Sequence, residues 1–385
     1  MTRQRRIYFD HNASTPLAEK ARAAIVRFLA DDHGGNPSSI HFEGRAARDQ
    51  LERARAQMAG LVGGQSAEII WTASGTEAVC LGLMGCARAR LKAGASPRVL
   101  VGASEHPSVL AAATLLGRQG FAIARLPVNG DGIIDLERAR PRILGGAAVI
   151  GLSLANHEVG TIQPIATIAE LAHEVGAAMF CDAVGAAGKL SIDLNALGVD
   201  ALAVSAHKFY GPRGVGALWL REGEVIEAAL IPGHQERERR GGTENILGAV
   251  SAGAAAAVAT TRTDVDSEHN AALSKRLELG LRELGAMVIG CEAPRVSNTT
   301  CFRFEGIGAE TLVAALDLRN FALSAGAACT SGKTEPSSVL LAMGLDAAIA
   351  KEAVRCSFGR GNDLAQVEQL LEELPAITSR IRRFH

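Results

Sequence analysis

The first 260 residues alternate short apolar runs with longer amphipathic or alanine-rich stretches, and this alternation constrains the fold more than any other feature. The apolar runs lie at 68–71, 98–101, 148–154, 178–181, 201–204 and 216–220. Strands that alternate with helical stretches typically form a mostly parallel sheet covered by helices. We therefore predict an α/β fold with such a sheet in this part of the chain.

The texture of the sequence changes near residue 260. A polar helix is expected at 267–284, followed by an apolar run at 299–304, a helix at 309–316 and an amphipathic helix from 363 onward. A chain of 385 residues exceeds the usual size of one hydrophobic core. We expect a large domain formed by 15–260, and a smaller α+β domain formed by 1–14 and 261–385.

Composition excludes several classes of protein. The chain is 48% apolar and 21% charged, which favours a globular fold over disorder. A formal net charge of −1 gives no support for nucleic-acid binding, and no stretch is apolar enough to cross a bilayer. With no secretory signal at the N-terminus, we expect a cytoplasmic location and neither nucleic acid nor membrane as a partner. The seven cysteines are widely spaced without a CxxC motif, so no metal site is expected.

Polar side chains follow five of the apolar runs. Because ligands bind at the carboxyl ends of the strands in open α/β sheets, five such ends together indicate one shared site. The residues concerned are Thr72, Ser74, Gly75, Thr76 and Glu77; Ser104, Glu105 and His106; Asn156, His157 and Glu158; Asp182; and Ser205, His207 and Lys208.

Two of these ends have features of a cofactor site. Gly75 and Thr76 begin a helical stretch, whose free N–H groups and positive dipole end can bind a phosphate. An ordinary helix cap by Ser74 or Thr76 explains the same residues. Asp182 ends an apolar strand, where a carboxylate needs a cationic partner such as the protonated ring nitrogen of a cofactor. A turn aspartate bonded to nearby backbone is the alternative.

Lys208 and Cys329 are candidate nucleophiles. A lysine just inside a strand end can be desolvated, which makes its amine reactive toward an aldehyde; a surface lysine is the simpler explanation. Cys329 lies in a loop rich in small residues, with Lys333 nearby, and a thiol in cationic company favours the reactive thiolate; a chance loop cysteine is the alternative. The same loop resembles a phosphate-binding P-loop, but five residues instead of four separate Gly326 from Gly332. We therefore disfavour a nucleotide hydrolase.

Together, these residues resemble the cysteine desulfurases of the class V aminotransferase group, which have fold type I of the enzymes that use pyridoxal 5'-phosphate (PLP). The resemblance runs from Tyr8 to about Gly359. The matching segments lie at 8–16, 35–41, 105–106, 156–164, 182, 205–208, 211–214, 235–237, 242–245, 329–337 and 355–359. The loop around Cys329 resembles the subgroup in which a mobile loop hands sulfur to acceptor proteins.

The resemblance implies PLP as the cofactor and a role for each matching residue. Lys208 would carry PLP on its amine, Asp182 would pair with the ring nitrogen, and His106 would stack on the ring and move protons. The remaining implied ligands are Gly75, Thr76, Ser205 and His207 for the phosphate, with Thr243 supplied by the partner subunit of a homodimer; Asn156 and His157 for the ring; and Arg355 with Asn156 for the substrate.

The resemblance also implies a reaction. Cys329 would attack the sulfur of bound L-cysteine, giving L-alanine and a persulfide on Cys329. A sulfur-acceptor protein, for example an iron–sulfur scaffold, would then take the sulfur. A divergent class V lyase or aminotransferase acting on another amino acid, and a catalytically weak scaffold for partner proteins, are the alternatives.

The sequence departs from the usual desulfurase pattern around the cofactor. His157 stands where the family usually has a second asparagine, and Gly185 where it usually has a glutamine. Val79 and Cys80 replace asparagines in the helix after Thr76. We expect His157 to take over the contact with the ring hydroxyl.

Overall fold

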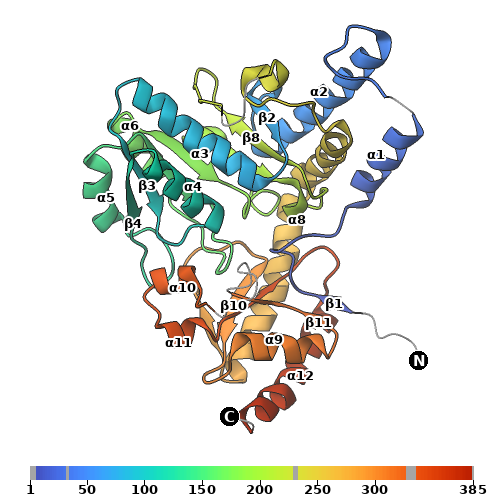
Figure 1. Cartoon of the computed structure of the whole chain (residues 1–385). Helices are drawn as coiled ribbons and strands as arrows, with labels where there is room; N and C mark the ends of the chain where they lie inside the picture. The colour runs from blue at the N-terminus through green and yellow to red at the C-terminus, as the bar shows by residue number, and fades with distance from the viewer. Residues whose placement is uncertain (1–5, 32–33, 229–232, 327–334, 384–385) are drawn as a thin grey trace.

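The computed structural model describes residues 6–31, 34–228, 233–326 and 335–383, and is built around a seven-stranded sheet (Figure 1). The strand order is β2-β8-β7-β6-β5-β3-β4. The strands are β2 (Ile69–Thr72), β3 (Arg98–Gly102), β4 (Ala122–Leu126), β5 (Val149–Ser153), β6 (Ala178–Asp182), β7 (Ala201–Ser205) and β8 (Gly216–Leu220). Only β8 runs against the others, because it pairs antiparallel with both β7 and β2. The predicted α/β fold with a mostly parallel sheet is confirmed.

Helices cover both faces of this sheet, as Figure 1 shows. The helices in this part of the chain are α1 (Glu19–Ala30), α2 (Phe42–Val62), α3 (Gly75–Lys92), α4 (Pro107–Arg118), α5 (Leu136–Leu144), α6 (Ile165–Glu174) and α7 (Leu194–Leu197), and α1 packs on a later helix rather than on the strands. The strands β5, β6, β7 and β8 are buried at every position. This burial explains why they appear in the sequence as continuous apolar runs rather than as an alternation.

A smaller sheet, with order β12-β13-β10-β9, forms a second core. Its strands are β9 (Met287–Ile289), β10 (Thr299–Arg303), β12 (Ser324–Ala325) and β13 (Val354–Ser357), all paired antiparallel. The helices α9 (Ala309–Asp317) and α12 (Leu364–Arg382) pack in this core, whereas α10 (Ser338–Ala342) and α11 (Ala347–Ala350) add buried residues to the core of the large sheet. The N-terminal strand β1 (Ile7–Tyr8) pairs with β11 (Phe321–Ala322).

One helix joins the two cores. Helix α8 (Ile246–Glu283) runs unbroken for 38 residues, from the large sheet into the smaller one (Figure 1). Its first half, with Ala252 and Ala256, packs in the core of the large sheet, whereas Leu273 and Leu277 pack in that of the small sheet. The boundary predicted at residue 260 falls inside this helix, so the exact division remains a prediction. Among the described residues, no helix combines the length and the apolar character needed to span a membrane.

Candidate active site

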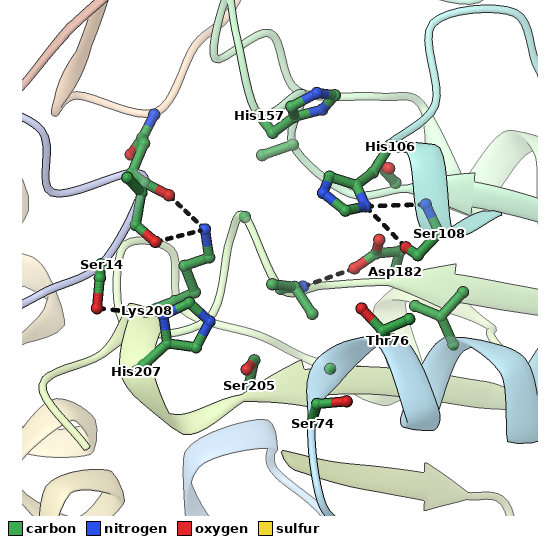
Figure 2. A pocket seen from close by; sticks show the side chains of 18 of the residues that line it. Ser14, Ser74, Thr76, His106, Ser108, His157, Asp182, Ser205, His207 and Lys208 are labelled. Carbon is green, nitrogen blue, oxygen red and sulfur yellow. Dashed lines mark hydrogen bonds between the residues drawn. The ribbon is translucent and has the colours of Figure 1, made fainter. Parts of the chain in front are cut away.

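A cavity of about 380 Å³ opens at the carboxyl ends of the parallel strands (Figure 2). Strands β5, β6 and β7, the N-termini of α3 and α4, and the segment 12–14 contribute to its wall. The cavity brings together eight residues that the sequence predicted for the site: Gly75, Thr76, His106, His157, Asp182, Ser205, His207 and Lys208.

The turn into α3 forms the floor of the cavity in Figure 2. Ser74 caps the helix, because its hydroxyl accepts a hydrogen bond from the N–H of Glu77 at 3.1 Å. A Cβ atom added at Gly75 would lie 2.8 Å from the Cβ of Ser205, so only glycine lets the turn approach the end of β7 this closely. The helix cap by Ser74 is therefore confirmed, whereas Thr76 lines the cavity and its role in binding a phosphate stays a prediction.

Asp182 ends β6 with only 4% of its surface exposed. Its Oδ1 accepts a hydrogen bond from the N–H of Val184 at 2.9 Å. Burial raises the pKa of Asp182 to about 6, although this hydrogen bond and the charge of Lys208 act in the opposite direction. A ligand that presents a cationic N–H group to this carboxylate would offset the cost of burying it.

Two histidine rings lie near each other on one side of the cavity (Figure 2). The rings of His106 and His157 are 5.0 Å apart, edge to face. Nδ1 of His106 accepts a hydrogen bond from the N–H of Ser108 at 3.1 Å, so the proton of the neutral ring resides on Nε2. Burial lowers the pKa of His106 to about 4, and Lys208 contributes in the same direction. The imidazole of His106 is therefore uncharged at neutral pH.

Lys208 lies at the end of the short turn η2 (Ala206–Lys208) that follows β7. Its Nζ donates hydrogen bonds to the carbonyl oxygens of Asn12 and Ala13, the second at 3.2 Å. A second lysine, Lys189, also lines the cavity and donates to Oδ1 of Asn12 at 2.7 Å. Burial lowers the pKa of Lys189 well below its usual value, with Lys208 adding to the effect.

The sequence analysis missed Lys189 and Asn12. Asn12 lies in a segment that the resemblance covered, and Lys189 follows Asp182 by seven residues. Their closeness in sequence to these segments could have marked them as candidates for the site. The turn before Lys189 is held close to the Lys208 segment. Gly188 has a φ of 73°, and a Cβ atom there would lie 2.6 Å from the Cβ of Phe209.

Three predicted ligands do not line the cavity. The side-chain oxygen of Asn156 accepts hydrogen bonds from the N–H groups of Glu158 and Val159, at 2.9 and 3.0 Å. Arg355 donates to Oδ1 of Asp10 at 2.8 Å and to the carbonyl of His157 at 2.9 Å. Thr243 is exposed. The structure gives these three side chains positions outside the cavity wall, and their roles as ligands remain predictions.

The predicted nucleophile Cys329 lies outside the described residues. The residues that flank its segment are described, and both meet Glu158, the neighbour of His157. The hydroxyl of Ser337 donates to Oε2 of Glu158 at 2.6 Å. A Cβ atom added at Gly326 would lie 3.0 Å from the same oxygen. Gly326 and Ser337, which lie on either side of residues 327–334, are therefore both close to Glu158, a residue next to the cavity wall.

Comparison with known proteins identifies the family. The model of the aminotransferase class-V family matches residues 7–370. The chain belongs to this family. A cysteine desulfurase from Cereibacter sphaeroides is 41% identical in an alignment 384 residues long, which covers 98% of this chain and 97% of that relative.

Solved structures of this family have the same fold. A NifS-like protein has a TM-score of 0.89 and 31% identity, covering 97% of this chain and 99% of its own. SspA in complex with cysteine has a TM-score of 0.79 and 29% identity, covering 92% of this chain and 99% of its own. The predicted fold type I is therefore confirmed.

Class-V aminotransferases use PLP, and the residues of the cavity fit this cofactor. Among the described residues of the wall, Asp182 is the one carboxylate, whereas Lys189, Lys208 and Arg213 are basic residues. Such a wall suits an anionic phosphate, and the buried Asp182 suits a protonated ring nitrogen. Within the described part of the chain, no group of three His, Cys, Asp or Glu side chains is arranged to hold a metal ion.

Proposed function

We propose that this chain is a PLP-dependent cysteine desulfurase that converts L-cysteine into L-alanine and a persulfide on Cys329. One observation supports this function above all. A single cavity joins the amine of Lys208, the buried carboxylate of Asp182 and the N-terminus of α3, in a chain 41% identical to a cysteine desulfurase along nearly its whole length.

The cavity residues divide into groups that suit the parts of PLP. The N-terminus of α3 with Thr76, together with Ser205 and His207, would hold the phosphate. Lys208 would carry the cofactor on its amine, and Asp182 would bind the ring N–H. PLP supplies an electron sink that stabilises negative charge on the α-carbon of the substrate.

His106 would transfer protons within the cavity. Its ring is neutral at neutral pH, with the proton on Nε2, and the hydrogen bond from Ser108 fixes that tautomer. A neutral imidazole accepts a proton at the nitrogen that carries none, here Nδ1, and the resulting imidazolium can release a proton from Nε2, so His106 could act first as a base and then as an acid. His157 would bind the ring hydroxyl, since its buried Nδ1 has no hydrogen-bond partner among the described residues.

Sulfur transfer needs a thiolate as nucleophile, and Cys329 would supply it. The C–S bond of cysteine breaks and an S–S bond forms on Cys329, so that one sulfur atom moves and alanine is released. Arg355 and Asn156 would bind the substrate, which requires Arg355 to exchange its contact with Asp10 for the substrate carboxylate. We further propose a cytoplasmic homodimer that passes sulfur to an acceptor protein, such as an iron–sulfur scaffold.

The departures around the cofactor fit this function. A Cβ atom at Gly185 would lie 2.7 Å from the carbonyl oxygen of Ala155, so the backbone here leaves no room for the glutamine that the family usually has. The neighbouring His157 supplies polar atoms in its place. Relatives named cysteine desulfurase that are 38% and 41% identical over nearly the whole chain favour a desulfurase over a lyase or aminotransferase.

Incubation with L-cysteine tests the proposal. Wild-type protein should release alanine and form persulfide, whereas Cys329→Ser should form neither above background. Borohydride reduction should trap PLP on Lys208, as located by mass spectrometry. A colourless wild-type protein with no adduct on Lys208, or persulfide formation that is unchanged in Cys329→Ser, would refute the proposal.

A further inference from the structure

A buried ion pair joins two segments at the edge of the large sheet. Arg55 lies on α2, and Glu236 lies in the short turn η3 (Gln235–Glu238). Their side chains are 4% and 1% exposed. Two parallel hydrogen bonds of 2.6 and 2.8 Å link the guanidinium to the two carboxylate oxygens. This bidentate geometry is the strongest that an arginine and a carboxylate form.

The pair also completes the hydrogen bonding of an edge strand. Strand β2 is the last in the order of the large sheet, so one of its sides has no neighbouring strand. On β2, the N–H of Trp71 donates to Oε2 of Glu236 at 2.9 Å. Arg55 donates to the carbonyl of Ile69 at 2.8 Å. The ion pair therefore satisfies both a donor and an acceptor that the sheet leaves open.

Glu236 begins a stretch of unusual backbone. The φ angles of Glu236, Arg237 and Glu238 are 47°, 56° and 62°, so three consecutive residues other than glycine are left-handed. This conformation is unfavourable for residues with a Cβ atom and persists only where the surroundings fix it. The buried carboxylate of Glu236 provides that fixation at the start of the stretch.

The same segment is tied to the turn that enters α3. Arg240 pairs with Glu77 at 2.8 Å, and Glu77 also accepts a hydrogen bond from the N–H of Ala73 at 2.7 Å. Thr243 follows closely, yet it is exposed and does not line the cavity of its own chain. Beside it, Oε2 of Glu244 is buried without a hydrogen-bond partner among the described residues. The segment is thus firmly held at one end and presents Thr243 away from its own site.

We propose that Glu236 is a positioning residue for the cofactor site of the neighbouring subunit. Its pairing with Arg55 holds the left-handed turn and so sets the direction in which the segment carries Thr243 toward the phosphate in a second copy of the chain. The inference rests on the proposed function, a homodimer, and on the role that the resemblance implies for Thr243, which would complete the cofactor site of the partner subunit.

Hybrid dimers test this inference, because they separate the subunit that carries PLP from the subunit that supplies the segment. The first hybrid combines a Glu236→Gln subunit with a Lys208→Ala subunit. Its only lysine-bearing site faces an intact segment. The second hybrid combines a wild-type subunit with a subunit that carries both substitutions. Its only lysine-bearing site faces the altered segment. The readout is the rate at which the PLP absorbance is lost after transfer to buffer without cofactor.

The Glu236→Gln homodimer and the second hybrid should release PLP about tenfold faster than wild type, as expected for a weakened polar contact to a charged group. The first hybrid should release PLP at the wild-type rate. Glu238→Gln, a matched change at a 71% exposed acid in the same turn, should also match wild type. Glu236→Asp, which keeps the charge but shortens the reach, replaces Glu236→Gln if the latter does not fold.

Fast release from the first hybrid with slow release from the second would overturn the inference, since Glu236 would then act within its own subunit. Equal release rates from the two hybrids would overturn it as well. Failure of the proposed function looks different, because wild-type protein would then retain no PLP on Lys208.

Discussion

Two buried aspartates at opposite ends of the parallel sheet differ in their hydrogen-bond partners. Asp182 at the carboxyl end of β6 and Asp200 just before β7, at the amino end, are 4% and 3% exposed. Asp200 has partners on several sides: His173 at 2.9 Å, Arg221 at 3.3 Å and the N–H of Met179 at 2.8 Å. Asp182 has one backbone hydrogen bond and a pKa raised to about 6. At the amino end, protein groups therefore pair with the buried carboxylate, whereas at the carboxyl end the proposed function leaves this pairing to the cofactor.

The largest expected effect is that of Lys208→Ala at the carboxyl end. We expect desulfuration to fall by at least about 10³-fold, roughly 4 kcal/mol, because the nucleophilic amine is removed. The free energy of unfolding of the apoprotein should change little. Assays of alanine release and urea unfolding measure the two quantities, with Lys351→Ala as the control at an exposed lysine. Full activity of Lys208→Ala would contradict a catalytic role for the carboxyl end of the sheet.

At the amino end, Asp200→Asn should lower the stability of the protein and leave its activity unchanged. The substitution removes the charge from the hydrogen bonds of Asp200, and because Arg221 and His173 are 40% and 42% exposed and stay solvated, the cost is about 1.5–3 kcal/mol. We expect a corresponding loss in the free energy of urea unfolding. The kcat of the folded fraction should stay at the wild-type value. A catalytic defect without a stability defect would contradict the comparison.

Asp182→Asn should stabilise the apoprotein at pH 7. The folded pKa of about 6 lies above the ordinary 3.8, so the contribution of this group to stability is fully present below pH 3.8 and is lost as the pH rises through 6. A neutral amide avoids this loss, which amounts to about 2–3 kcal/mol. The gain should disappear near pH 4, where the carboxyl is mostly protonated in the native protein. Urea unfolding of both apoproteins at the two pH values measures it, and a gain at pH 4 equal to that at pH 7 would show that charge is not the cause.

The smallest expected effect concerns His157. A lost neutral hydrogen bond to the ring hydroxyl is worth about 1 kcal/mol, so His157→Ala should weaken PLP binding about fivefold and change the absorption spectrum of the bound cofactor. Titration of the apoprotein with PLP measures the affinity. His157→Asn restores the residue that the family usually has and should recover much of it. An unchanged spectrum and affinity in His157→Ala would refute the predicted contact.

Much of the carboxyl end could be predicted from the sequence. Runs buried on both faces are continuous in their apolar character, and the polar residues that follow them are adjacent in sequence to the strands that place them. Because of this adjacency, the sequence predicted that His106, Asp182 and Lys208 share one site. All three line the cavity. The direction of β8 could not be predicted in the same way, because a strand buried on both faces has the same pattern whether it runs parallel or antiparallel.

Other features depend on contacts between distant segments. Arg55 and Glu236 are 181 residues apart, and neither has a local pattern that reveals its partner. Lys189 has its position in the site through Asn12, which is 177 residues away. The change of texture near residue 260 marks a change in what α8 packs against, not an end of the helix.

The continuity of α8 limits how the molecule can deform. A helix of 38 residues is about 57 Å long at 1.5 Å per residue, and this one contains no proline. Its two halves are buried in different cores. A rotation of one core against the other must therefore bend the helix or break its backbone hydrogen bonds. We therefore expect substrate binding to shift shorter segments around the cavity rather than to rotate one core against the other.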